Sequence, residues 1–286
     1  AGALPEWALR CEVTAEHVQY TVKRIEAAEV KRAPYPHFHL TDVFHPEVYA
    51  CMMAKMPATG SKIFSKLERN NERYSIQLRD EDKEGRLWRG PHTGIAKPYT
   101  PVPADSEEID VKFWAAWSDA FASAEVTKAY LAAMDETLAL RAAHNKKTQM
   151  GEDTLHWNMA MTRDISGYAI GPHTDAVRKK LTVLYYLPRE NDAPDNAGTC
   201  VMKPKPGKAK ASQPQPTRAR RMSFSDFDVY EQAPFVPNSV FVFAPCQTAW
   251  HAVPKMKAQY TRDTIQAFLR DTGGDVIKGP CPGTEE

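Results

Sequence analysis

The first half of the chain carries its hydrophobic residues at helical spacing. In residues 13–30, Val18, Val22 and Ile25 recur every three or four positions with charged residues between them, as on a helix with one buried face. Pro34 ends this pattern, because proline cannot continue a helix. Helices are therefore predicted at residues 13–30, 45–55 and 105–144, and a short alternating strand at residues 36–44.

The second half of the chain changes to the patterns expected of strands. Residues 180–187, for example, are rich in β-branched and aromatic side chains. Strands are predicted at residues 154–162, 180–187, 239–244 and 261–269. Residues 68–94 are polar and weakly periodic, and we expect a loop there with one strand near residues 74–78. Helices followed by strands that are separated by turns favour an α+β fold, an antiparallel sandwich or jelly roll buttressed by helices.

The length of 286 residues suits a single domain, and no internal repeat is visible. We expect a mainly helical buttress over residues 1–150, a jelly-roll core over residues 151–272 and a tail over residues 273–286. The core contains a basic segment, residues 203–221, with seven basic residues, four prolines and no acidic residue. Such a composition cannot build a core, so a mobile loop between strands is predicted.

Composition excludes several classes of function. The net charge of +1 gives no general basic field of the kind that dominates nucleic-acid binding. No apolar stretch is long enough to cross a membrane, and no secretion signal is evident at the start. The five cysteines are odd in number, far apart and without a CxxC pair, which suggests neither a disulfide framework nor a zinc knuckle. A reducing cytoplasm is therefore the expected location.

Two His-x-acid motifs occur, and their contexts differ. His45 and Glu47 stand at a helix start, where the acid is an ordinary first-turn residue. His173 and Asp175 follow Gly-Pro and precede a strong strand, so both side chains can project to one side and share a metal. His251, just beyond the strand at residues 239–244, is the candidate third ligand. Two imidazoles and one carboxylate leave coordination positions open, as non-haem Fe(II) sites require.

A candidate anion clamp follows the third ligand. Arg262 comes eleven residues after His251, and Thr264 lies on the same face of the predicted strand. A guanidinium binds a carboxylate bidentately and stays charged at any working pH. This arrangement suits the distal carboxylate of a dicarboxylate.

The motifs together resemble the Fe(II)/2-oxoglutarate-dependent dioxygenases, especially the prolyl-hydroxylase-like branch. The resemblance covers roughly residues 154–269 and rests on Gly-Tyr-Ala-Ile-Gly-Pro-His-Thr-Asp (167–175), Leu-Thr-Val-Leu-Tyr-Tyr-Leu-Pro (181–188), Gly-Thr (198–199), Pro-Asn-Ser-Val-Phe-Val-Phe (237–243), Trp-His (250–251) and Arg-x-Thr (262–264). It implies a double-stranded β-helix core of the cupin type. It further implies that His173, Asp175 and His251 bind Fe(II), while Arg262 and Thr264 bind 2-oxoglutarate.

The resemblance also implies a reaction. 2-Oxoglutarate and O2 are the cosubstrates, and decarboxylation to succinate is coupled to oxidation of an unactivated C–H bond, with no catalytic side chain beyond the metal centre. Hydroxylation is the default outcome, while desaturation and cyclisation stay open. The expected substrate is a small molecule such as an amino acid or natural-product intermediate. The alternatives are a peptide or protein hydroxylase and a cupin-like metal-binding protein without oxygenase activity.

Further residues are candidates for contact with 2-oxoglutarate or substrate. His156 and Asn158 share the face of their strand opposite Trp157, and a structural role is an equal alternative for both. Arg163 and Tyr168 lie between that strand and the His-x-Asp turn, as a carboxylate partner and a hydrogen-bond donor. The basic segment 203–221 is interpreted as an active-site lid, a docking site for an acidic partner such as a carrier protein, or disordered chain. It has no aromatic residue for base stacking, and the oligomeric state stays open.

Overall fold

The computed structural model describes residues 11–67, 70–80, 87–89, 100–145, 154–189, 197–217, 221–256, 260–272, 275 and 277–283. Its N-terminal part contains helices where the sequence predicts them. They are α2 (Ala15–Glu26), α3 (Pro46–Ala54), α4 (Val111–Phe121), α5 (Ala124–Ala133) and α6 (Asp135–His144). Local signals set their starts: Thr14 and His17 form a capping box before α2, and Asp110 accepts a hydrogen bond from the Phe113 amide at the start of α4.

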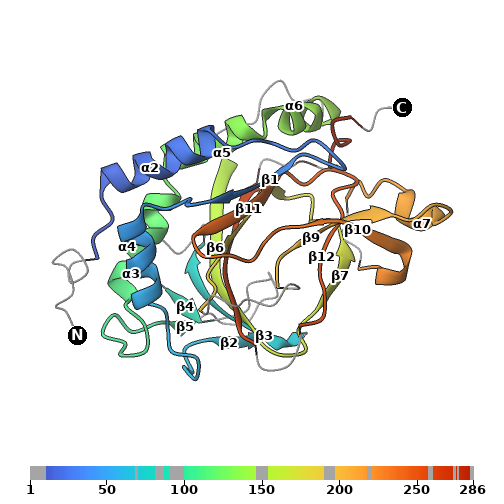
Figure 1. The fold of residues 1–286 in the computed structure, drawn as a ribbon. Helices are drawn as coiled ribbons and strands as arrows, with labels where there is room; N and C mark the ends of the chain where they lie inside the picture. Colours follow the sequence, from blue (N-terminus) through green and yellow to red (C-terminus); the bar gives the residue numbers. More distant parts are fainter. Residues whose placement is uncertain are drawn as a thin grey trace.

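A large antiparallel sheet forms the centre of the molecule (Figure 1). Its strands run in the order β1 (His37–Thr41), β11 (Ser239–Phe243), β8 (Lys179–Tyr186), β13 (Arg262–Asp271), β6 (Leu155–Asp164), β3 (Asn70–Arg79), β4 (Trp88–Arg89) and β5 (Thr100–Pro101), with β2 (Ser65–Leu67) paired to β3. The four strands predicted in the second half of the chain are β6, β8, β11 and β13, so the sequence identifies the middle of this sheet.

A small antiparallel sheet lies opposite and is missing from the sequence-based prediction. It contains β10 (Phe227–Gln232), β9 (Cys200–Pro204), β12 (His251–Val253) and β7 (Ile170–His173), in that order. The eight strands from β6 to β13 thus pass between the two sheets, and the large sheet takes β6, β8, β11 and β13 while the small sheet takes the rest. This is the topology of a double-stranded β-helix, or jelly roll, as expected.

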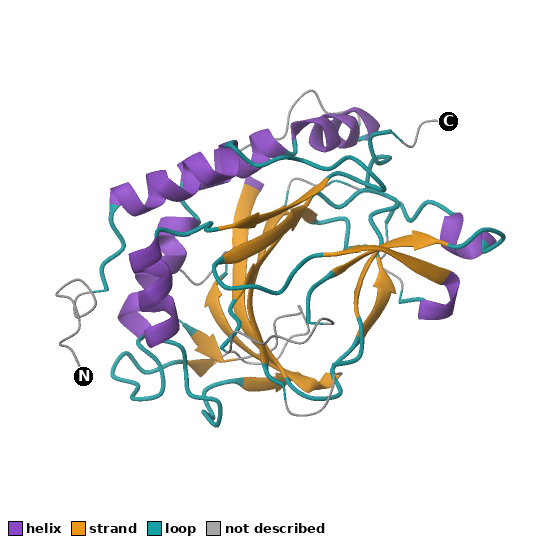
Figure 2. Cartoon of the chain, viewed as in Figure 1, coloured by secondary structure: helices purple, strands orange, loops and turns teal. Residues whose placement is uncertain are grey.

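Alternation along the strands of the large sheet separates an outer core from the interior of the barrel. In β8, Val183 and Tyr185 face the helices, whereas Leu184 and Tyr186 face the small sheet. The outer core is rich in aromatic residues, and the Phe44 ring lies 4.9 Å from that of Tyr185. Figure 2 shows the N-terminal helices on one side of the barrel. They therefore seal one face of the large sheet, and the site must lie inside the barrel.

Two regions expected to be loops are ordered. Within the polar stretch 68–94, β3 pairs with β6 over most of its length, so the strand predicted near residues 74–78 is longer than expected. In the basic segment 203–221, residues 203–204 belong to β9 and a short helix α7 (Ala209–Ser212) follows. Lys205 and Lys208 pair with Asp228 and Asp226 near β10. The segment therefore contains a strand end and a short helix, and only residues 218–220 lie outside the described residues.

The cysteine prediction is also wrong. Cys11 pairs with Cys51, Cys246 pairs with Cys281, and Cys200 is a buried free thiol. The partners are 40 and 35 residues apart, so spacing alone gave no signal. Disulfides persist in oxidising compartments, and this pairing weighs against the expected reducing cytoplasm. No helix in the described ranges is long and apolar enough to span a bilayer.

Candidate metal centre

Strand pairing in the small sheet brings the two motif histidines together. His251 is the first residue of β12 and pairs directly with His173, the last residue of β7, and their ring centroids are 4.2 Å apart. Asp175 follows two residues later, and its Oδ2 lies 3.9 Å from His251 Nε2. One ligand atom from each residue lies within 4.8 Å of the others. The three predicted ligands therefore converge on one point inside the barrel.

Backbone carbonyls fix the orientation of both imidazoles. His173 Nδ1 lies 2.9 Å from the Gly171 carbonyl oxygen, and His251 Nδ1 lies 3.1 Å from that of Ala249. A carbonyl oxygen can only accept, so each Nδ1 carries the proton and donates. Each Nε2 then keeps its lone pair for a metal, and metal-binding histidines usually donate their other ring N–H to a carbonyl or carboxylate in this way.

Burial keeps the donor set in the protonation state that a metal needs. It lowers the pKa of His173 to about 3, with the charge of His251 as the next cause, and burial also lowers the pKa of His251. The pKa of Asp175 is lowered although burial opposes this, because the Lys179 ammonium and the two histidines favour the carboxylate. Two neutral imidazoles and one anion at neutral pH fit a divalent iron with open coordination positions.

A second cluster of the same composition has the opposite proton arrangement. In His17, Nδ1 accepts from the Thr14 amide, and in His45, Nδ1 accepts from the Glu47 amide at the start of α3. The proton of each neutral ring is therefore on Nε2, and that of His17 points towards Glu47, 3.5 Å away. This cluster is held by helix caps and presents no Nε2 lone pairs to a metal.

Two side chains that the sequence-based prediction omits hold the Asp175 carboxylate. Lys179 Nζ donates to Oδ1 at 2.7 Å, and the Thr182 hydroxyl donates to Oδ2 at 2.6 Å. Lys179 also lies over the Phe268 ring, 3.3 Å from its centroid. Thr182 alternates with Leu184 and Tyr186 on the side of β8 that faces the barrel interior. This alternation is the signal in the sequence that could have identified it. Both contacts fix the direction of the carboxylate.

An arginine cluster lies at the end of β6 and β13. Arg262 Nη1 and Arg73 both pair with Asp164, which is fully buried, and Arg73 does so through Nε at 2.5 Å and Nη2 at 2.8 Å. Arg262 Nε donates to the Ala197 carbonyl, but no described residue accepts from its Nη2. Two guanidiniums against one carboxylate leave one excess positive charge. The cluster therefore fits one further carboxylate.

Further polar groups surround this cluster. The Tyr168 ring lies under Arg73, 4.3 Å from its guanidinium carbon, and its buried hydroxyl has no hydrogen-bond partner. Thr199 lies against the Tyr186 hydroxyl, which accepts from its amide at 3.1 Å. Thr264, proposed from the sequence, bonds to the Thr162 hydroxyl at 2.7 Å. Buried polar atoms without partners are rare in folded proteins, so the Tyr168 hydroxyl is free to bond to a polar ligand.

Charges of the histidine–aspartate group and of the arginine cluster act on shared neighbouring residues. The pKa of Lys179, which binds Asp175, is lowered first by burial, and the charge of Arg73 acts in the same direction. Burial raises the pKa of Tyr35, followed by the charges of Asp175 and Tyr186, and the Tyr186 ring lies 5.6 Å from the Arg262 guanidinium. The two groups therefore interact electrostatically inside the same barrel.

The structure does not favour Arg163 as a ligand contact. Arg163 has outward parity and pairs with Asp263, and it donates to backbone carbonyls of residues 57–59. His156 lies opposite Arg270, which in turn lies opposite Lys179, so it is at the Asp175 end of the sheet and its role stays a prediction. Asn158 faces inward as predicted and donates to Asp80 at 3.0 Å. The inward carboxylate next to Arg163 is Asp164, which the sequence-based prediction missed.

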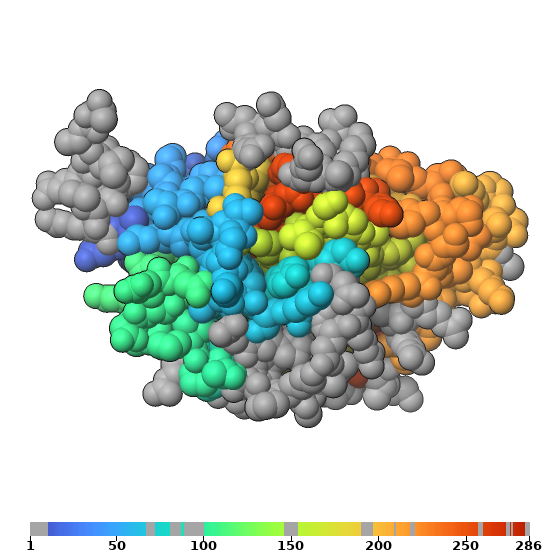
Figure 3. All heavy atoms as spheres, turned by 90° about the horizontal axis from the view of Figure 1, so that it is seen from below, coloured from blue at the N-terminus to red at the C-terminus, as the bar shows by residue number. Residues whose placement is uncertain are grey.

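Figure 3 shows the face on which these segments reach the surface. The region of β3 (cyan), the stretch from β6 to β7 (yellow-green) and chain near the start of β13 (red) meet there, between the N-terminal part in blue and the β9–β10 region in orange. The segments that carry the arginine cluster and the histidine motif are therefore neighbours on one side of the molecule.

No protein-family model matches the chain, and no curated protein matches its sequence. Among solved structures, a prolyl-4-hydroxylase from Pseudomonas putida is 15% identical with a TM-score of 0.42, covering 88% of this chain and 100% of the other. A 2OG-Fe(II) oxygenase family oxidoreductase from Burkholderia pseudomallei is 12% identical with a TM-score of 0.45, covering 95% and 96%. HygX from Streptomyces hygroscopicus, with nickel and 2-oxoglutarate bound, is 10% identical with a TM-score of 0.40, covering 92% and 89%.

The chain is similar to these enzymes. What the site can do follows from its own geometry.

The lowered pKa of His173 predicts that the metal-free protein loses stability in mild acid. The unfolded chain takes up a proton near pH 6.5 and the folded chain only near pH 3, so stability falls as pH drops through this window. At pH 5 this histidine alone costs about 2 kcal/mol relative to pH 7.5. Urea unfolding of wild type and His173→Gln at both pH values measures this. An equal loss of stability in the variant would contradict the assignment.

Proposed function

We propose that the protein is an Fe(II)- and 2-oxoglutarate-dependent oxygenase that hydroxylates an unactivated C–H bond of a small molecule such as an amino acid or natural-product intermediate. One observation carries this proposal. Inside one barrel, two imidazole Nε2 atoms and the Asp175 carboxylate converge, and a buried arginine cluster with one excess positive charge lies at the end of β6 and β13. A metal store without oxygenase activity has no use for such a carboxylate site.

Each part of the chain has a separate role in this proposal. His173, His251 and Asp175 would bind the iron, while Lys179 and Thr182 orient the carboxylate of Asp175. When bound, iron and 2-oxoglutarate supply the oxidising chemistry.

The cosubstrate would be held at both ends. Arg262 would bind its distal carboxylate through Nη2, with Thr264 on the same strand face, and the Tyr168 hydroxyl could donate to it. Phe243 packs on His251, with 4.6 Å between ring centroids, and Tyr186 packs near Arg262. These rings exclude water, which strengthens each charge interaction.

The test is addition of Fe(II) and 2-oxoglutarate under anaerobic conditions while the visible spectrum is recorded. Chelation of iron by 2-oxoglutarate gives a charge-transfer band, which we expect in wild type and not in His173→Ala. Admission of air should then convert 2-oxoglutarate to succinate. Absence of both the band and succinate from metal-saturated wild type would refute the proposal.

A further inference from the structure

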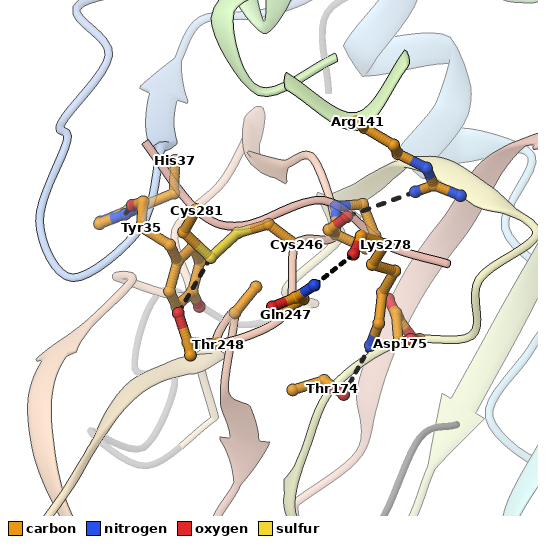
Figure 4. Close-up of a disulfide and its surroundings, with 12 residues drawn as sticks. Tyr35, His37, Arg141, Thr174, Asp175, Cys246, Gln247, Thr248, Lys278 and Cys281 are labelled. Atoms are coloured by element: carbon orange, nitrogen blue, oxygen red, sulfur yellow. Dashed lines mark hydrogen bonds between the residues drawn. A yellow bond between two sulfur atoms is a disulfide. The ribbon is translucent and has the colours of Figure 1, made fainter. Parts of the chain in front are cut away.

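A buried lysine from the C-terminal segment, residues 277–283, contacts the chain between two of the proposed ligands. Lys278 is fully buried, and its Nζ donates to Thr174 Oγ1 at 2.7 Å and to the Asp175 carbonyl oxygen at 2.8 Å. Figure 4 shows the side chain extending from this segment to Thr174 and Asp175. Thr174 lies between His173 and Asp175 in the sequence. The ammonium therefore binds the short stretch that carries both ligands.

The contacts of Lys278 differ from those of the two residues that hold the carboxylate. Lys179 and Thr182 bind the side-chain oxygens of Asp175, whereas Lys278 binds its backbone oxygen. The backbone position and the side-chain direction of Asp175 are thus fixed by separate groups. Burying an ammonium is costly, so an apolar residue would fill this space more cheaply unless the contact has a use.

The segment that carries Lys278 is held on two sides. On one side Gln247 binds it, since its side chain donates to the Lys278 carbonyl at 2.8 Å and its amide donates to that of Gly279 at 3.0 Å. On the other side the segment packs against α6, where a Cβ on Gly279 would lie 2.7 Å from Arg141 Cα. The disulfide between Cys246, next to Gln247, and Cys281 closes this arrangement covalently (Figure 4).

We propose that Lys278 is a positioning residue for the metal ligand Asp175 and that the Cys246–Cys281 disulfide holds it in place. This proposal rests on the proposed function, since it takes Asp175 as a metal ligand. In this proposal Lys278 contacts neither the metal nor the substrate. It acts by fixing residues 173–175 before the metal binds. Without Lys278 these residues would have to become ordered when the metal binds, which lowers the affinity for the metal.

The experiment measures the dissociation constant of Co(II) alone, by competition with a chromophoric chelator and without 2-oxoglutarate. We expect Lys278→Met to weaken Co(II) binding about tenfold or more, as removal of an outer-shell partner does. The paired change Cys246→Ser with Cys281→Ser should weaken binding by a similar factor. In the proposal the disulfide acts only through Lys278. All three substitutions together should therefore weaken Co(II) binding no more than the stronger of Lys278→Met and the serine pair does.

The other disulfide is the matched control. Cys11→Ser with Cys51→Ser also removes one disulfide, far from the metal centre in the sequence, and should lower the melting temperature without changing Co(II) affinity. Thr174→Val removes one acceptor of Lys278 with little change in volume, and it should weaken binding in wild type but not in Lys278→Met. These comparisons separate positioning from general stability.

The outcomes are distinguishable from failure of the proposed function. If wild type and His173→Ala bind Co(II) equally weakly, the metal centre itself is wrong. If wild type binds tightly and folded Lys278→Met or Thr174→Val binds equally tightly, the positioning role is wrong. If the two serine pairs weaken binding equally, or if the effects of Lys278→Met and the Cys246 pair add fully, the disulfide does not act through Lys278.

Discussion

Replacing His173 by alanine is expected to reduce metal affinity by more than the 10- to 100-fold that loss of an outer-shell partner costs, and to abolish 2-oxoglutarate turnover. The imidazole is oriented by the Gly171 carbonyl so that Nε2 faces His251 and Asp175. Alanine leaves two donors, too few to hold Fe(II) against water. Co(II) titration and succinate formation measure the two effects.

The second histidine cluster supplies a matched control. His45→Ala removes the same group from a cluster of the same composition, but its Nδ1 accepts a backbone proton and its Nε2 has no lone pair to offer. We expect unchanged Co(II) stoichiometry and affinity in this variant. Equal losses in His45→Ala and His173→Ala would show that the proton arrangement does not distinguish the two clusters.

Replacing Arg262 by methionine is expected to raise the half-saturating concentration of 2-oxoglutarate roughly 30-fold to several-thousand-fold. The reason is charge: with Arg262 removed, Arg73 and Asp164 form a neutral pair, and the excess positive charge of the cluster is lost. Removing one partner of a buried, hydrogen-bonded ion pair costs about 2–5 kcal/mol. Co(II) affinity without 2-oxoglutarate should stay at the wild-type value.

Arg163→Met makes the same change one register position away on the outer side of the sheet. Arg163 is paired with Asp263, so its loss should lower thermal stability and leave the 2-oxoglutarate requirement unchanged below the new melting temperature. A rise in the half-saturating concentration comparable to that of Arg262→Met would show that position 262 has no special role in binding the cosubstrate.

The sequence predicts the large sheet better than the small one, and the reason is physical. The middle strands of the large sheet, such as β8, are long and pack one side against helices, so their alternation is strong. The small sheet has short strands: β7 contains Gly171 and Pro172, and β12 is three residues long with an irregular register to β7. Such strands carry no periodic signal.

Residues of the candidate site could be predicted where residues with related roles lie close together in the sequence. His173 and Asp175 lie two apart, and Arg262 follows His251 at a fixed distance along the chain. Arg73, Lys278 and the disulfide partners reach the site only through tertiary packing, so no local spacing could reveal them. Asp164 could have been predicted in part. Side chains alternate along β6, so if Asn158 faces the barrel interior, Asp164 does so too.

The charged pairs at the end of β6 and β13 also specify how these strands align. Arg163 lies opposite Asp263 on the outer side, and Asp164 lies opposite Arg262 on the inner side. If β6 shifted by one residue against β13 in one direction, Arg163 would lie opposite Arg262. A shift in the other direction would place Asp164 opposite Asp263. Like charges directly opposite destabilise a strand pair. Arg262, which is proposed to bind the cosubstrate, thereby also helps to specify the correct strand alignment.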